Sequence, residues 1–280
     1  MHYLILFICL ISTLDAESEE TSATPTYSPT LDVPTGDDEP HSWPWKVSLQ
    51  CKDKDRYVHT CGGALINESW VLTAAQCFVR CYKYRAVLGV RVLSKTKVTV
   101  TKQIFYLKHS DIFIHEKWNP DHQTYGYDIA LIRLPTEVNI TSEVNLILLP
   151  ALEDILPKEY TCYITGWKER RLAIGPLLSD VLQQTRLSVV DHGTCTSEDW
   201  WDRNVNLNMI CAIGDLKSDC IGDSGGPLSC RRETGDWEVH GIASFYSSRG
   251  CFAAKKPIVF TRVSAFIDWI QNIITLNTLE

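Results

Sequence analysis

Cys220-Ile-Gly-Asp-Ser-Gly-Gly-Pro227 is the stretch of this sequence that says most about its fold. A serine that acts as a nucleophile needs its hydroxyl on a tight turn, with backbone N–H groups aimed at the oxyanion that develops during the reaction. The glycines on both sides of Ser224 permit both features. A glycine-rich turn alone is weak support, because it can be ordinary loop chemistry, so the rest of the chain has to decide.

Short segments with strand periodicity begin at Ser42. Trp45, Val47 and Leu49 alternate with polar residues, which is the period of a half-buried strand. Similar runs, punctuated by glycine, proline and asparagine, recur at 63–66, 98–100, 129–134, 162–167 and 240–244. Several short strands separated by turns favour an antiparallel sandwich or barrel. The apolar residues of 263–274 instead fall on one helical face, so we expect an all-β body that ends in a helix.

Four further motifs accompany the Ser224 turn. They are Thr73-Ala-Ala-Gln-Cys77, Tyr127-Asp-Ile-Ala-Leu131, Cys162-Tyr-Ile-Thr-Gly-Trp167 and Val259-Phe-Thr-Arg-Val263. Together these motifs make the chain, from about Ser42 to Ile274, resemble the chymotrypsin-like serine proteases, and most closely the pancreatic chymotrypsin-like elastases. The resemblance implies an all-β fold of two six-stranded antiparallel barrels, with the active site between them and a helix at the C-terminus.

The chain has 11 cysteines, a number typical of an oxidising compartment. The resemblance implies four disulfides, which are Cys61–Cys77, Cys162–Cys230, Cys195–Cys211 and Cys220–Cys251. Cys51 and Cys81 are then left over, and the family layout would put their two loops side by side, so we predict a fifth bridge between them. Cys9 remains, and it lies in the N-terminal segment.

The first 40 residues differ in character from the rest. Residues 1–16 read as a signal peptide, whose apolar run is too short to span a bilayer. Residues 17–40 are acidic and rich in Ser, Thr and Pro, which predicts a disordered pro-segment or tail; we favour a solvated tail over an O-glycosylated stalk. Residues 41–280 form the predicted protease-like domain. Asn67 and Asn139 begin glycosylation sequons, which a secreted chain would present on surface loops.

The net charge of −7 comes from the N-terminal segment, because residues 1–40 hold 8 of the 34 acids and none of the 27 Lys and Arg residues. The remainder has 26 acids against 27 bases, so no basic field would attract a nucleic acid. The loop from Gly89 to Lys102 contains no acid, so we expect no calcium site there. We expect a secreted monomer with no membrane span, metal or cofactor.

The resemblance places Ser224 at the nucleophile position and Asp128 at the buried carboxylate position, with Gly222 and Ser224 supplying the oxyanion N–H groups. The third member departs from the family, whose motif Ala-Ala-His-Cys ends here with Gln76 in place of histidine. An amide has no titratable proton near neutral pH and cannot act as general base. Loss of such a histidine costs on the order of 10⁶ in turnover in a related site. Another histidine could stand in, although none matches the position; the candidates are His59, His109, His115, His122, His192 and His240.

Activation of the site is also expected to fail. Relatives are cut after Arg or Lys, and the new amino group then pairs with the Asp that corresponds to Asp223. Counting back from the first strand puts this cut after Leu31, and the first basic residue of the chain is Lys46. In zymogens of the family the carboxylate is instead held by a histidine and a serine, which are present here as His59 and Ser48. We therefore predict a permanent Asp223–His59–Ser48 arrangement.

The resemblance puts Ser218 at the base of the specificity pocket, with Tyr246 and Ile258 at wall positions that are usually small, which predicts a crowded pocket. Our leading hypothesis is a secreted, catalytically inactive elastase-like homologue that binds protease inhibitors, substrates or receptors. The first alternative is a weak serine endopeptidase that uses Ser224 and Asp128. A second alternative is a mucin-like or structural secreted protein that acts through its acidic tail.

Overall fold

The computed structural model describes residues 36–37, 42–79, 81–94, 102–167, 169–172, 175–178, 180–214, 223–250 and 253–278. These residues all belong to one compact unit, residues 33–280. The predicted signal peptide, most of the acidic segment and the predicted strand at 98–100 lie outside the described residues. Within the described part of the chain, no helix has both the length and the apolar character needed to cross a membrane.

The first barrel forms from the N-terminal half of the chain. Its strands are β2 (Lys46–Asp53), β3 (Arg56–Asn67), β4 (Trp70–Thr73), β5 (Tyr84–Leu88), β6 (Gln103–Leu107), β7 (Ile112–Ile114) and β8 (Ala130–Arg133). They pair in the antiparallel order β6-β5-β2-β3-β4-β8-β7. The edge strands β6 and β7 follow each other in the chain and are separated only by a 3₁₀ turn, η2 (His109–Asp111). They are therefore two parts of one bent strand, and the barrel is six-stranded.

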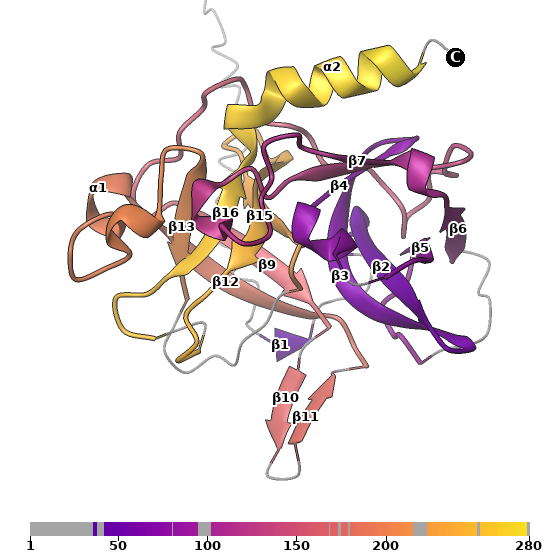
Figure 1. Ribbon diagram of the computed structural model, residues 1–280, viewed down its shortest axis with the longest axis horizontal. Helices are drawn as coiled ribbons and strands as arrows, with labels where there is room; N and C mark the ends of the chain where they lie inside the picture. Colours follow the sequence, from indigo (N-terminus) through magenta and orange to yellow (C-terminus); the bar gives the residue numbers. More distant parts are fainter. Residues whose placement is uncertain are drawn as a thin grey trace, which may run out of the picture. The chain divides into compact units, whose positions relative to one another are not determined.

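The second barrel forms from the C-terminal half. Its strands are β9 (Thr161–Gly166), β12 (Gln183–Val190), β13 (Met209–Ile213), β14 (Pro227–Arg231), β15 (Trp237–Phe245) and β16 (Ile258–Arg262). They pair in the order β12-β13-β16-β15-β14-β9, and β12 also pairs with β9, which closes the ring. A short strand, β1 (Gly36–Asp37), adds to β12. Figure 1 shows this orange and yellow barrel beside the indigo strands of the first one.

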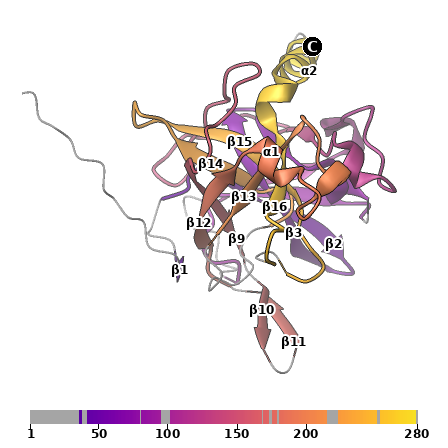
Figure 2. The ribbon, with the colours of Figure 1, turned by 90° about the vertical axis from the view of Figure 1, so that its left-hand side faces the viewer.

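Short helices and one hairpin complete the described chain. The helices are η1 (Ala75–Phe78), η3 (Gln123–Tyr125), α1 (His192–Cys195), η4 (Asp202–Asn204), η5 (Val263–Phe266) and α2 (Ile267–Thr278). The hairpin of β10 (Glu169–Leu172) and β11 (Gly175–Leu178) projects away from both barrels in Figures 1 and 2.

Helix α2 leaves the second barrel and packs on the first. Arg133 donates a hydrogen bond of 2.9 Å to the Asn277 carbonyl, and the Trp269 indole donates one of 3.2 Å to Glu116. The helix buries Ile267 and Ile270, as its apolar period predicts. The predicted all-β fold of two six-stranded barrels with a C-terminal helix is thus confirmed.

Strand β2 corrects one prediction. Its alternating sequence predicted a half-buried strand, but its polar residues Lys46, Ser48 and Gln50 are as buried as the apolar ones, with exposed fractions of 2%, 0% and 6%. The reason is that β2 faces protein on both sides. Its apolar residues belong to the main hydrophobic core, whereas its polar residues have buried partners of their own. The Lys46 ammonium donates a hydrogen bond to the carbonyl of Thr165 on β9 of the second barrel, and Ser48 and Gln50 bond His59 on β3 and Arg85 on β5.

Each barrel contains disulfides that link its own segments. The structure contains Cys51–Cys81, Cys61–Cys77, Cys162–Cys230 and Cys195–Cys211. These are four of the five predicted pairs, including the additional bridge between the two leftover cysteines. The fifth predicted pair, Cys220–Cys251, lies outside the described residues.

Candidate active site

The turn that carries Ser224 lies between the two barrels. The Gly226 amide donates to the Asp223 carbonyl at 2.9 Å, and the Gly225 amide donates to the Ala243 carbonyl at 2.8 Å. The Ser224 carbonyl accepts a 2.8 Å hydrogen bond from the amide of Gly62 on β3. Gly225 has a φ of +77°, and a Cβ there would collide with the Thr73 hydroxyl, so only glycine fits. Both barrels therefore fix the turn.

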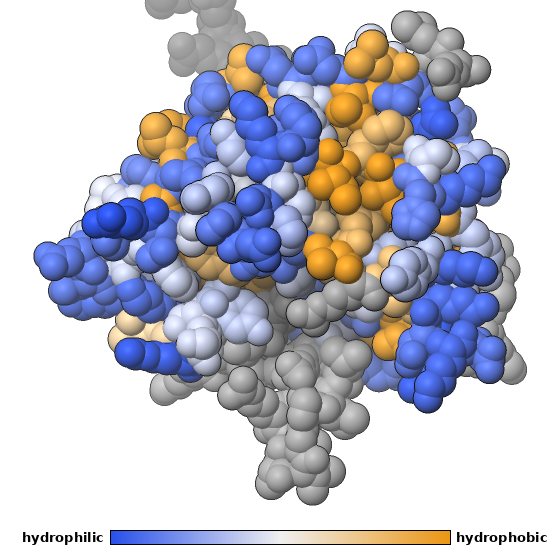
Figure 3. Space-filling model, viewed as in Figure 1, coloured by the Kyte–Doolittle hydropathy of each residue, from blue (hydrophilic) through white to orange (hydrophobic). Residues whose placement is uncertain are grey.

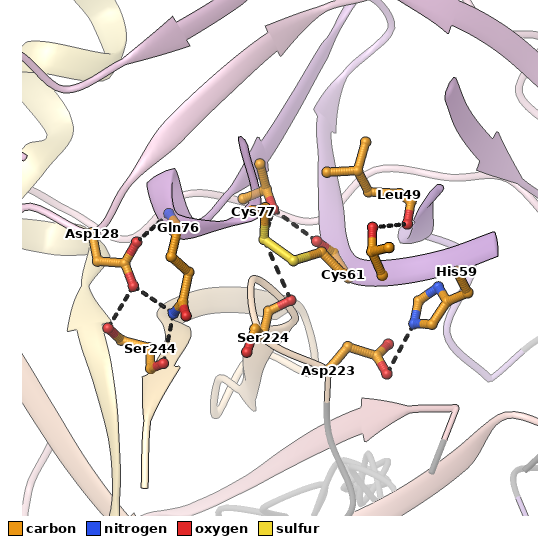
Figure 4. Close-up of a disulfide and its surroundings, with 12 residues drawn as sticks. Leu49, His59, Cys61, Gln76, Cys77, Asp128, Asp223, Ser224 and Ser244 are labelled. Carbon is orange, nitrogen blue, oxygen red and sulfur yellow. Dashed lines mark hydrogen bonds and ion pairs between the residues drawn. A yellow bond between two sulfur atoms is a disulfide. The ribbon is translucent and has the colours of Figure 1, made fainter. Parts of the chain in front are cut away.

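Gln76 and Asp128 meet beside this turn. η1 places Gln76, and Asp128 lies just before β8 with an exposed fraction of 1%. The Gln76 side-chain amide donates to Asp128 Oδ2 at 2.7 Å, and its backbone N–H donates to Oδ1 at 2.9 Å. The Ser244 hydroxyl donates a third hydrogen bond, of 2.6 Å, to Oδ2. Figure 4 shows Gln76 reaching toward Asp128 and Ser244.

The orientation of the Gln76 amide is fixed by its partners. An ionised carboxylate only accepts hydrogen bonds, so the NH₂ group must face Asp128. The same nitrogen donates to the Ser244 carbonyl at 2.6 Å, and the amide oxygen accepts a weak 3.4 Å hydrogen bond from Gln123. Among the described residues, neither Gln76 nor any histidine makes a hydrogen bond to Ser224.

The electrostatics of Asp128 follow from its burial. Burial raises the pKa of its carboxyl above the ordinary value, and the hydrogen bonds from Ser244 and Gln76 offset part of this increase. Ser244 was not recognised from the sequence as a site residue. A serine in a strand carries no distinctive signal, and only the fold brings its hydroxyl to a carboxylate that lies 116 positions away.

A second buried carboxylate, Asp223, lies next to Ser224 in the chain and points the other way, toward β2 and β3. His59 Nε2 lies 3.1 Å from Asp223 Oδ1, and the two side chains are each 5% exposed. The Ser48 hydroxyl lies 2.8 Å from His59 Nδ1, and the Trp167 amide donates a 3.0 Å hydrogen bond to Asp223 Oδ1. The structure thus brings the three predicted residues Asp223, His59 and Ser48 together, and Figure 4 shows the contact between Asp223 and His59.

Lys46 is a further partner of Asp223 that sequence reasoning missed. Its ammonium lies 2.9 Å from Asp223 Oδ2 and donates a 2.7 Å hydrogen bond to the Thr165 carbonyl. Burial alone would raise the pKa of Asp223, but the nearby Lys46 and His59 outweigh it and hold that pKa well below its ordinary value. The alternation of β2 indicated only polarity, and polarity in a strand is usually a sign of solvent rather than of a buried ion pair.

A cleft of about 430 Å³ opens beside Gln76 and Ser224. Its other lining residues are Thr60, Val79, Trp118, Pro120, Gln123 and the cysteines of the Cys51–Cys81 and Cys61–Cys77 bridges. Val79 and Ile114 are exposed apolar residues, at 56% and 42%. Figure 3, in the view of Figure 1, shows apolar side chains gathered on this face around β7. The site therefore keeps a cavity of the size that holds a few side chains.

The remaining predicted pocket and oxyanion residues are only partly described. Gly222 and Ser218 lie outside the described residues. Ile258 on β16 is buried, whereas Tyr246 is 54% exposed and so does not fill a closed cavity. With the base of the pocket not described, the crowded pocket and the oxyanion hole stay predictions.

The two predicted glycosylation sites differ in exposure. Asn139 is exposed, while Asn67 is half-buried and its side-chain oxygen accepts a 2.9 Å hydrogen bond from the Ser69 amide. Occupancy of both sites stays a prediction.

One cluster of groups that could ligate a metal occurs among the described residues. Asp154, Glu238 and His240 have ligating atoms within 4.8 Å of one another. Glu238 is already engaged at both oxygens, by Arg232 at 3.3 Å and by His240 at 3.0 Å. We therefore assign no metal to this cluster. Residues 95–101 of the loop expected to lack calcium lie outside the described residues.

Comparisons with known proteins agree with this geometry. The trypsin family profile matches residues 33–270. Proproteinase E from Bos taurus is 45% identical over 250 residues, which cover 89% of this chain and 97% of that protein. Human chymotrypsin-like elastase family member 3B is 45% identical over 89% of this chain and 92% of its own length, and human member 3A is 47% identical over 84% and 86%. The chain therefore belongs to the trypsin family of chymotrypsin-like serine proteases.

Proposed function

We propose that this protein is a secreted, catalytically inactive elastase-like homologue, a pseudoprotease that acts by binding other proteins. The observation that carries the proposal is that the Gln76 side-chain amide, where the resemblance expects the general base, hydrogen-bonds Asp128 and the Ser244 carbonyl. A base must accept the proton of the serine hydroxyl as the serine attacks and later return it to the leaving amine. An amide does neither near neutral pH, so Asp128 has no imidazolium to stabilise.

The surroundings of Asp223 support the same proposal. In the family, the active arrangement needs Asp223 paired with a new α-amino group, yet here its oxygens face Lys46, His59 and the Trp167 amide. These contacts support the predicted zymogen-like arrangement of Asp223, His59 and Ser48. Secretion is supported by the disulfides, which persist in oxidising compartments.

The expected partners are protease inhibitors, substrates or receptors that recognise the protease fold. The open cleft beside Ser224 and the apolar groups around it favour contact with a protein chain. The protein would not capture inhibitors that must form an acyl-enzyme with Ser224. It would still bind inhibitors that dock noncovalently and reversibly on the protease surface.

A weak serine endopeptidase is the second candidate, because Ser224 and the cleft remain present beside Asp128. Residual catalysis without a complete triad is about 10³–10⁴ over water in related sites. A fluorophosphonate probe separates the two candidates, since it labels only a serine that is nucleophilic. We expect no labelling of the purified, unmodified protein; stoichiometric labelling at Ser224, abolished in Ser224→Ala, would contradict the pseudoprotease.

A further inference from the structure

We propose that Lys46 is a built-in counter-ion of Asp223, which holds the Ser224 turn in its zymogen-like arrangement whether or not the N-terminal segment is cleaved. Lys46 is thus a positioning residue that acts through Asp223. The inference rests on the proposed function, because it explains how a site that keeps Ser224 and Asp128 is held inactive.

The surroundings of the Lys46 ammonium are shaped for it. Lys46 is 2% exposed, and besides Asp223 its ammonium contacts the Thr165 carbonyl and lies 5.6 Å from the centre of the Trp167 ring. A Cβ on Gly62 would lie 2.6 Å from the ammonium nitrogen, and one on Gly226 would lie 2.9 Å from it. Two glycine backbones thus leave the space that the ammonium occupies.

The charges of this cluster balance without an α-amino group. Asp223 Oδ1 faces His59 and the Trp167 amide, and Oδ2 faces Lys46. A new N-terminal amino group could pair with Asp223 only by drawing the carboxylate away. That movement would leave the buried Lys46 ammonium with the Thr165 carbonyl as its remaining partner, and an unpaired buried charge is strongly unfavourable. The ion pair therefore opposes the activating rearrangement.

A purely structural lysine would behave differently. Its replacement would lower stability but would not change how Ser224 responds to an N-terminal amino group. The decisive readout is therefore the reactivity of Ser224 after cleavage, compared with and without Lys46.

The experiment uses the full chain with a restored base and a restored cleavage site, Leu31→Arg/Asp32→Ile/Gln76→His. Immobilised trypsin cuts it, N-terminal sequencing verifies the new Ile terminus, and a fluorophosphonate probe reports the labelling rate of Ser224. We expect slow labelling while Lys46 is present and labelling at least about tenfold faster after Lys46→Gln is added. Lys52→Gln, an exposed position on the same strand, is the matched control and should leave the rate unchanged.

Equal labelling rates with and without Lys46, whether fast or undetectable, would overturn the inference.

A double-mutant cycle in the otherwise unmodified chain tests the ion pair itself: Lys46→Gln and Asp223→Asn should each lower Tm by on the order of 10 °C, and the double variant should recover part of the loss. Additive losses would also overturn the inference. Labelling of the unmodified protein would instead end the proposed function and leave the Lys46 comparison standing.

Discussion

Replacing Ser244 with alanine tests the polar cluster around Asp128. The change deletes one hydroxyl that lies 2.6 Å from Asp128 Oδ2 and keeps the backbone carbonyl that accepts from Gln76. Ser244 is 8% exposed and Asp128 is 1% exposed, so water has little access to replace the lost donor. The variant therefore removes one hydrogen bond to a buried charged group.

The size of the effect follows from the charge of the acceptor. A hydrogen bond to a charged group contributes about 1.5–3 kcal/mol, so we expect the free energy of unfolding to fall by about 2 kcal/mol at neutral pH. For a domain of about this size that loss lowers Tm by roughly 4–8 °C.

The loss also depends on pH, with a defined sign. Because burial raises the pKa of Asp128 in the folded state, folded protein binds this proton more tightly than the unfolded chain, and the contribution to stability falls as pH rises between the unfolded and the folded pKa. Ser244→Ala raises the folded pKa further and widens that interval. Below about pH 3.9 the folded carboxyl, whose pKa is raised, is protonated, and the variant loses only a neutral hydrogen bond, about 1 kcal/mol.

Urea and thermal unfolding at about pH 3.5 and about pH 7.5 measure both values. The matched control is Ser229→Ala, a buried serine on β14 whose hydroxyl accepts a 3.2 Å hydrogen bond from the neutral indole of Trp45. Its loss should be about 1 kcal/mol at both pH values. The reasoning is refuted if Ser244→Ala costs the same at both pH values, or no more than Ser229→Ala at neutral pH.

Three further changes test other parts of the structure. Gln76→His alone should leave elastase and chymotrypsin peptide substrates uncut, because it restores a base and does not free the Ser224 turn; measurable turnover would show that the base was the only serious loss. Gly62→Ala should lower the free energy of unfolding by about 1–3 kcal/mol, because its Cβ would lie 2.8 Å from the Gly226 Cα, and an unchanged Tm would contradict this contact. The double variant Cys51→Ser/Cys81→Ser should lose about 3–4 kcal/mol in urea unfolding, since the bridge spans a separation of 30 residues; a loss under about 1 kcal/mol would mean that these loops stay constrained without it.

Much of the fold could be predicted, because its signals are local. The helical period near the C-terminus depends only on which side chains share a face, and Phe266, Ile267 and Ile270 are buried as that period requires. The two barrels followed from the family resemblance. Strand β2 was misjudged for a physical reason: alternation reports which side chains are polar, and a polar face can be covered by protein when its groups find partners there, as Lys46 does at Thr165.

The candidate site was predictable only where the resemblance supplied positions. Gln76 and Asp128 are 52 residues apart, and no local pattern pairs them; the family motifs did. Ser244 and Lys46 were not predicted as site residues, because each acquires its role from a tertiary contact that the quoted motifs do not contain. Contacts between residues far apart in the chain depend on which strands pair, and a single sequence does not show that pairing.

Both site carboxylates are buried and have close polar partners in the structure. Asp128 accepts two hydrogen bonds from Gln76, one from the side-chain amide and one from the backbone N–H. Asp223 has the Lys46 ammonium beside it, 2.9 Å from Oδ2. A buried carboxylate without partners would cost several kcal/mol and would threaten the fold. Under the proposed function, these contacts satisfy both carboxylates without supplying a group for proton transfer, so the stability of both barrels does not depend on catalysis.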